Sequence, residues 1–153
     1  YPLRGKNTIT LVNAGIWGDT TSGGLARASA IAAMQPALVI LELGGNDGLR
    51  GFPIESTRAN LERIIETLQP SGATVVLAGM TLPPNYGPDY IARFEAIYPE
   101  LAAEHKLPLI PFLLEGVAGG GEFMQNDGIH PTSEGNRRVA RHVFETLTPL
   151  LAR

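Results

Sequence analysis

Two short apolar runs separated by an amphipathic segment constrain the fold of this chain more than any other feature of its sequence. The runs are Ala37–Leu43 and Thr74–Met80, and each is almost continuously apolar. Such runs are typical of strands that are covered on both faces, as in a parallel sheet. Between them, Glu55–Gln69 repeats apolar residues at i, i+3, i+4 and i+7, which is the pattern of an amphipathic helix. A strand, a crossover helix and a second strand form a βαβ unit, so we expect parallel strands.

The rest of the chain continues this alternation, without a linker or an internal repeat. Pro99 falls inside one predicted helix and is expected to kink it or divide it into two. We therefore expect a single α/β domain over residues 1–153, with a parallel sheet and helices on both of its faces. The further predicted elements are a strand at Thr8–Asn13, helices at Thr20–Met34 and Asp89–Lys106, a strand at Leu107–Pro111 and a closing helix at Thr132–Leu151.

Charge and composition exclude several classes of partner. The net charge is −3, and no cluster of Lys and Arg is dense enough for nucleic acid. No apolar run is long enough to span a membrane, so stable membrane insertion is not expected. Cysteine is absent, which excludes disulfides and thiolate metal sites. The sequence implies no metal and no cofactor, and it leaves the oligomeric state open.

The sequence Asp127-Gly-Ile-His130-Pro131 stands just before the last predicted helix. Histidine is the usual general base near neutral pH, and it needs an acceptor that fixes its tautomer. An aspartate three residues earlier in a turn can reach the imidazole of His130, which favours a catalytic pair. The same letters also suit a turn cap followed by a solvated residue at a helix start, and the pair alone does not separate the two interpretations.

Two glycine-containing loops follow predicted strands, where the chemistry of parallel sheets collects. In Gly44-Gly45-Asn46-Asp47, the amide of Asn46 could donate to a developing oxyanion. In the loop before Thr20, Gly18 offers an unencumbered backbone N–H for the same task. Each loop could equally be an ordinary turn in which Gly, Asn and Asp adopt left-handed backbone angles.

Three of these segments together resemble conserved blocks of the GDSL/SGNH hydrolases. They are NAGIWGDT (Asn13–Thr20), LELGGNDGLRG (Leu41–Gly51) and DGIHP (Asp127–Pro131). With LPPNYG (Leu82–Gly87), they are most similar to the bacterial arylesterase, acyl-CoA thioesterase I and lysophospholipase L1 group. The resemblance implies a three-layer α/β/α sandwich of flavodoxin-like type, and a serine ester hydrolase that works through an acyl-enzyme. It also favours a periplasmic or secreted bacterial protein.

Carried over residue by residue, the resemblance assigns roles to residues in all four segments. Gly18 and Asn46 would be the oxyanion-hole donors, and His130 would be the general base, oriented by Asp127. The substrate would be a small acyl ester or thioester. The residues expected at the substrate pocket are Asp47, Leu82, Pro83, Asn85 and Tyr86.

The nucleophilic serine of the family is not found in this sequence. The family carries it in a strand ending in Gly-Asp-Ser, which we expect before Tyr1. The five serines of the chain lie in no such context, and they are Ser22, Ser29, Ser56, Ser71 and Ser133. We therefore expect an N-terminally truncated domain that lacks one strand as well as the serine and is inactive alone.

Three other interpretations remain at this point. A non-catalytic binding module would keep the pocket and lack the nucleophile. A metal-dependent hydrolase would use Asp127, His130 and Asp47, although divalent sites of that kind usually gather more ligands. A flavodoxin-like nucleotide binder would need a phosphate loop, and neither the G-x-G-x-x-G spacing nor a Walker Lys-Ser/Thr is present.

Overall fold

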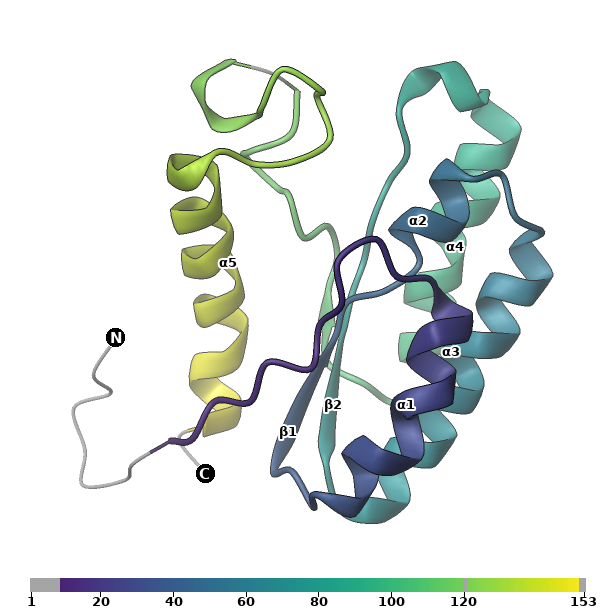
Figure 1. Cartoon of the computed structure of the whole chain (residues 1–153), viewed down its shortest axis with the longest axis vertical. Coiled ribbons are helices and arrows are strands. Elements are labelled where there is room, and N and C mark those ends of the chain that lie inside the picture. Colours follow the sequence, from purple (N-terminus) through teal and green to yellow (C-terminus); the bar gives the residue numbers. More distant parts are fainter. Residues whose placement is uncertain (1–8, 120, 152–153) are drawn as a thin grey trace.

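Three parallel strands form the centre of the molecule (Figure 1). The structure is a computed structural model that describes residues 9–119 and 121–151. The strands are β1 (Leu38–Leu41), β2 (Thr74–Ala78) and β3 (Leu109–Ile110), in the order β1-β2-β3. Leu41 pairs with Leu77, and Leu77 pairs in turn with Leu109, in parallel ladders. The predicted parallel sheet is confirmed.

Helices connect and cover these strands. The five α-helices of the described chain are α1 (Thr21–Ala33), α2 (Gly45–Leu49), α3 (Ile54–Leu68), α4 (Pro88–Glu104) and α5 (Ser133–Leu151). Three 3₁₀ turns lie between them, at η1 (Gln69–Ser71), η2 (Pro84–Tyr86) and η3 (Gly121–Phe123). Four of the five α-helices match predicted helices to within a few residues, and α2 was predicted as loop. No helix in the described residues is both long enough and apolar enough to cross a membrane.

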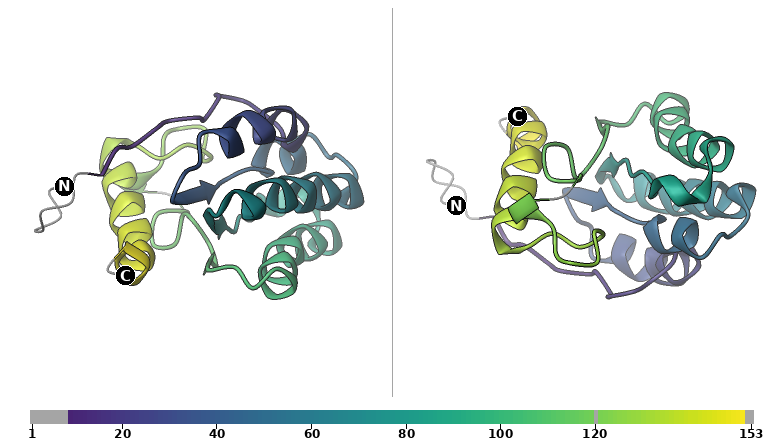
Figure 2. Two further views of the ribbon diagram at one scale, coloured as in Figure 1. Left: turned by 90° about the horizontal axis from the view of Figure 1, so that it is seen from below. Right: turned by 90° about the horizontal axis from the view of Figure 1, so that it is seen from above.

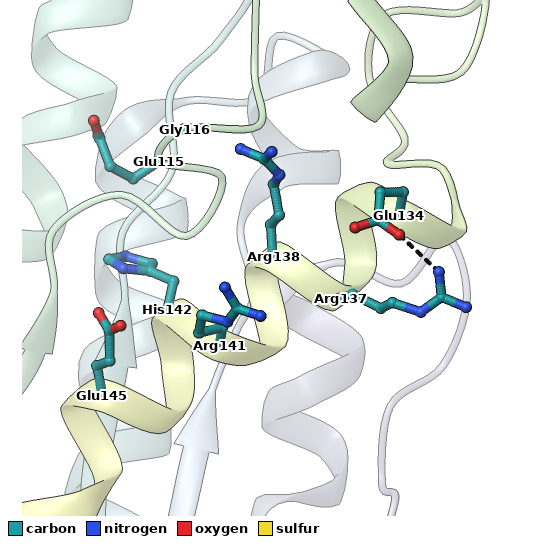
Figure 3. A pocket seen from close by; sticks show the side chains of 8 residues that line it. All are labelled: Glu115, Gly116, Glu134, Arg137, Arg138, Arg141, His142 and Glu145. Atoms are coloured by element: carbon teal, nitrogen blue, oxygen red, sulfur yellow. Dashed lines mark hydrogen bonds and ion pairs between the residues drawn. The ribbon is translucent and has the colours of Figure 1, made fainter.

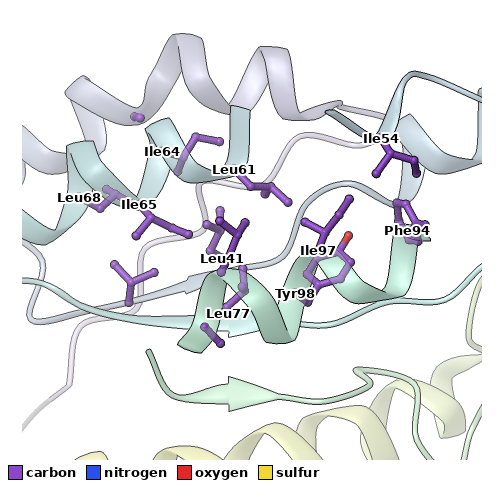
Figure 4. Close-up of a cluster of buried hydrophobic side chains, with 14 of the residues drawn as sticks. Leu41, Ile54, Leu61, Ile64, Ile65, Leu68, Leu77, Phe94, Ile97 and Tyr98 are labelled. Atoms are coloured by element: carbon purple, nitrogen blue, oxygen red, sulfur yellow. The ribbon is translucent and has the colours of Figure 1, made fainter. Parts of the chain in front are cut away.

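Alternate residues of the strands build two separate cores, one on each face of the sheet. On one face, Leu41, Val75 and Leu77 pack against the buried stripes of α3 and α4 (Figure 4). On the other face, Val76 and Ile110 pack against α5. Figure 2 shows α5 on one side of the sheet, with α3 and α4 on the other side. The result is the expected α/β/α arrangement of three layers.

The helix α4 runs without a break through Pro99, so the expected division is wrong. Phe94, Tyr98 and Leu101 lie on one stripe that spans the proline, and all three are buried. Burial of that stripe holds both halves of the helix in one register. Pro99 itself is exposed, so the hydrogen bond that it cannot donate is lost on the solvent side.

The predicted strand at Thr8–Asn13 is also wrong over its described residues, 9–13, while Thr8 lies outside the described residues. This segment is extended but has no ladder partner, and Leu11 is 88% exposed. A strand exists only where a neighbour accepts its hydrogen bonds, and β1 pairs only with β2 in the described sheet. Ile40 of β1 pairs in register with Val76 and is 38% exposed, so β1 is not covered on both faces as predicted.

Candidate active site

A hairpin between Met124 and Pro131 presents Asp127 and His130 just before α5. Met124 and Pro131 form an isolated antiparallel bridge, and the Gln125 N–H donates to the carbonyl of His130 at 2.8 Å. The bridge closes the turn, and the hydroxyl of Thr132 accepts the N–H of Gly135 at 3.2 Å to cap α5. The backbone therefore fixes the turn at both ends.

The carboxylate of Asp127 contacts both the backbone and the ring of His130. Its Oδ2 lies 2.8 Å from Nδ1 of His130, and its Oδ1 accepts the N–H groups of His130 at 3.0 Å and Ile129 at 2.9 Å. The N–H of His130, then its ring, then the N–H of Ile129 lower the pKa of Asp127 to about 2. The carboxylate is therefore ionised near neutral pH. An ionised acceptor at Nδ1 favours the tautomer whose Nε2 lone pair can take a proton.

This Asp–His pair is accessible. The side chains of His130 and Asp127 are 53% and 45% exposed. Within residues 9–119 and 121–151, the Nε2 of His130 has no hydrogen-bond partner. The nitrogen that would act as the base is thus not engaged by a described donor or acceptor.

Gly18 is held in a conformation that suits glycine. Its φ is +71°, in the left-handed region that side chains rarely adopt. Its carbonyl accepts a hydrogen bond from Arg50 at 3.0 Å. Its own N–H has no acceptor among the described residues. Gly18 is therefore held through its carbonyl oxygen, while its N–H is not engaged by a described acceptor.

Asn46 lies in the first turn of α2, directly after the turn made by Gly44 (φ +110°). The Nδ2 of Asn46 donates one hydrogen to the carbonyl of Asp19 at 2.9 Å. An amide carries two hydrogens, so a second donor remains. Because Asp19 follows Gly18, the two predicted oxyanion donors belong to segments that touch one another.

An ion pair stiffens the Gly18 loop. Asp19 pairs with Arg27 of α1, and it also accepts the N–H of Thr20 at 2.8 Å. The hydrogen bond from Arg27 is the main cause that lowers the pKa of Asp19. The loop is thus tied to the first turns of α1.

The structure brings the predicted catalytic residues together as two groups. Asp127 and His130 form one group, and Gly18 and Asn46 form the other. The segments that carry them, the chain before α5 and the short helix α2, both lie toward the end of the sheet where β1 and β2 terminate (Figure 1). Among the described residues, no hydrogen bond joins one group to the other.

The residues predicted for the substrate pocket have different surroundings. Asp47 and Leu82 are 2% and 5% exposed, so neither side chain is open to solvent in the described structure. Leu82 belongs to the core beneath α2, and Asp47 is bonded to Thr21. The hydroxyl of Tyr86 donates to the carbonyl of Leu49 at 2.7 Å, while Pro83 is half-buried and Asn85 is exposed.

Two hollows of the described surface lie away from these residues. One, of about 390 Å³, is lined by charged side chains of α5 and by Glu115 and Gly116 (Figure 3). Its arginines and glutamates balance one another, and Arg137 pairs with Glu134 at 2.7 Å. The other, of about 370 Å³, is mainly apolar and lies between α4 and the ends of β2 and β3. Neither hollow is lined by a predicted pocket residue.

Sequence reasoning missed the residues that support the two predicted oxyanion donors. Arg50, Thr21 and Asn60 all hydrogen-bond within or beside the two donor segments. Arg50 follows the GGNDGL run directly, which was a signal that it could belong to the loop. Thr21 and Asn60 gave no signal, because their partners lie far away in the sequence.

The chain matches known proteins over most of its length. The sequence model of the GDSL-like Lipase/Acylhydrolase family matches residues 2–138. The chain is 50% identical over 142 residues to Esterase TesA of Pseudomonas aeruginosa, covering 92% of this chain and 71% of that protein. It is 43% identical over 147 residues to the Thioesterase 1/protease 1/lysophospholipase L1 of Escherichia coli K12, covering 95% of this chain and 71% of that protein.

Solved structures show the same relationship. A crystal structure of TesA superposes with a TM-score of 0.87 at 50% identity, covering 91% of this chain and 78% of that chain. The same relative is therefore similar to this chain in both fold and sequence. The chain belongs to the GDSL-like lipase/acylhydrolase family.

Proposed function

We propose that this chain supplies the general base, its orienting carboxylate and two oxyanion donors of a serine ester hydrolase. The observation that carries the proposal is the 2.8 Å contact between Asp127 Oδ2 and His130 Nδ1, which leaves Nε2 of His130 exposed and without a described partner. A structural turn would need only the backbone bonds to Asp127. The ring contact adds the tautomer control that a general base requires.

The chemistry follows the acyl-enzyme route. Nε2 of His130 takes the proton of a serine hydroxyl as its oxygen attacks the acyl carbon, and the carbonyl electrons move onto the oxygen. The Gly18 N–H and the free Asn46 hydrogen stabilise that oxyanion. His130 then gives the proton to the leaving group, and water releases the acyl group by the reverse sequence. Asp127 stays ionised throughout, as its pKa of about 2 requires.

The attacking serine is proposed to come from a segment outside these 153 residues. None of the five serines of the chain hydrogen-bonds to His130 in the described structure. Ser22 and Ser29 lie on α1 and Ser56 lies on α3. Ser71 donates to the carbonyl of Leu68, and Ser133 begins α5. Each of these five has a place in a helix or a turn.

The substrate class is proposed from the relatives. Their names describe an esterase and a thioesterase/lysophospholipase, so a small acyl ester or thioester is expected. The carbonyl carbon of an ester or a thioester is electrophilic because its C=O bond is polarised toward oxygen, and the same two donors can bind either oxyanion.

A burst assay tests the proposal. The chain alone is compared with a joined protein, in which those residues of the P. aeruginosa relative that precede the region matched by this chain are placed before Tyr1. With p-nitrophenyl butyrate, the joined protein should release one burst of nitrophenol per molecule, and the chain alone should release none. A burst from the chain alone would contradict the proposal that the attacking serine lies outside these 153 residues. A folded joined protein without turnover would contradict the hydrolase and favour a binding module.

A further inference from the structure

The carboxylate of Asp47 is buried and has no catalytic task in the proposed reaction. It is 2% exposed, and both of its oxygens face Thr21. Oδ2 accepts the Thr21 N–H at 2.9 Å, and Oδ1 accepts the Thr21 hydroxyl at 2.5 Å. Burial of a charge is costly unless hydrogen bonds compensate it, so a retained buried carboxylate calls for a structural reason.

The two partners of this contact lie next to the two oxyanion donors. Thr21 begins α1, three residues after Gly18, and Asp47 follows Asn46 directly. The contact therefore ties the segment that carries one donor to the helix that carries the other. The Nδ2 of Asn60, on α3, also donates to the Thr21 hydroxyl at 3.1 Å. The threonine is thus held from two sides.

Two further bonds join the same segments, but both are more accessible. Asn46 donates to the carbonyl of Asp19, and Arg50 donates to the carbonyl of Gly18. Arg50 is exposed, so water competes for its bond. The Asp47–Thr21 contact is shielded from water and charge-assisted, which makes it the strongest of the three ties.

We propose that Asp47 is a positioning residue that fixes the separation of the Gly18 and Asn46 donors, an inference that rests on the proposed hydrolase function. An oxyanion hole works only if its donors are oriented before the charge forms. A shift of about 1 Å in a reacting group can cost about 100-fold in rate. The carboxylate acts on the reaction through Thr21 and never touches the substrate.

Four variants separate positioning from general stability. Asp47→Asn places an amide donor or a weaker acceptor against the Thr21 N–H. Thr21→Val removes the hydroxyl but keeps the shape of the side chain. Thr21→Ser keeps both donors and should restore the contact. Thr57→Val is the matched control, because Thr57 is a buried threonine on α3 whose hydroxyl has only a 3.4 Å bond to the Pro53 carbonyl.

The first readout uses the 153-residue chain and does not depend on activity. Amide exchange at Thr21 should accelerate about tenfold in Asp47→Asn, because a charge-assisted bond is lost. The Gly18 amide resonance should shift in Asp47→Asn and Thr21→Val, but not in Thr21→Ser or Thr57→Val. An unchanged Gly18 resonance in folded Asp47→Asn or folded Thr21→Val would overturn the proposal. If Asp47→Asn does not fold, Thr21→Val decides the test.

The second readout is the kinetics of the joined protein. Asp47→Asn and Thr21→Val should lower kcat about 10- to 100-fold and leave KM within about twofold, because only the charged intermediate needs aligned donors. Thr21→Ser and Thr57→Val should keep the parent kcat. A proportional loss in Thr57→Val would assign the effect to stability and overturn the positioning role. If the unsubstituted joined protein is inactive, the hydrolase proposal fails, while the Gly18 resonance still decides whether Asp47 positions the loop.

Discussion

At the scale of single residues, Asp127 combines two tasks that are usually separate. Its Oδ1 caps the turn through the N–H groups of Ile129 and His130, and its Oδ2 contacts the His130 ring. The bonds that cap the turn thus also hold the carboxylate beside the imidazole. This explains how a short sequence motif positions a base without support from a distant element.

The titration of Asp127 follows from these bonds. Its pKa of about 2 in the folded chain lies below the ordinary value of 3.8. The bonds therefore stabilise the fold fully above pH 3.8, and that contribution is lost as the pH falls through about 2. In His130→Ala the midpoint should rise but stay below 3.8, because the backbone donors remain. The carboxyl carbon resonance of Asp127 measures this, and a midpoint of 3.8 in the unsubstituted chain would contradict the geometry.

The conformation of Gly18 gives a second prediction for a single residue. A Cβ at Gly18 meets no atom within 4 Å, so alanine would be penalised by φ = +71° alone. Gly116 has φ = +70° and is equally free of contacts, which makes it a matched control. Both Gly→Ala changes should lower the free energy of unfolding by about 1–2 kcal/mol. Denaturant unfolding measures both. If Gly18→Ala left the free energy of unfolding unchanged while Gly116→Ala lowered it, Gly18 would not have the left-handed backbone conformation described here.

At the scale of elements, the helices differ in how firmly the sheet holds them. The inward side chains of α3 are fully buried, whereas those of α5 are only partly buried. The hydrophobic contribution grows with the area removed from water, so α5 is held less firmly than α3. The hairpin that carries His130 leads directly into α5. The position of the base therefore depends on the more weakly packed layer.

Two leucine substitutions test this difference. Leu61 of α3 is fully buried, so Leu61→Ala should cost about 2–5 kcal/mol of unfolding free energy. Leu147 of α5 is half-buried, and Leu147→Ala should cost less than about 1.5 kcal/mol. Urea denaturation of the two variants gives the comparison. Equal losses would show that α5 is packed as tightly as α3.

At the scale of the whole molecule, periodic patterns predicted most of the fold. Apolar runs predicted the strands β1 and β2, and apolar residues at helical spacing predicted the helices α3 and α5. The predicted bounds lie within a few residues of those in the structure. The segment at Thr8–Asn13 has a strand-like pattern too, but a strand also requires a partner, which no local pattern reveals. The short helix α2 was missed because its sequence, Gly-Asn-Asp-Gly-Leu, has low helix propensity and is held by tertiary bonds.

The candidate site shows the same limit. The Asp127–His130 contact spans three residues, and the sequence predicted it. The contact between Asp47 and Thr21 spans 26 residues and joins two helix starts, so spacing could not predict it. The sequence assigned Asp47 to the substrate pocket, and it gave no sign that the Asp47 side chain is buried and bonded to Thr21. The sequence thus predicted the contact between residues close together in the chain, but not the contact between residues far apart in it.

The role of His130 is the central claim, and one histidine comparison tests it most directly. In the joined protein, His130→Ala should lower kcat for p-nitrophenyl butyrate by at least about 1,000-fold, as expected for loss of a general base. His142→Ala is the control, because His142 lies on α5 and its Nε2 lies 3.1 Å from the carbonyl oxygen of Phe112. That variant should keep the parent kcat. Turnover by His130→Ala at the level of His142→Ala would contradict the assignment of His130 as the base.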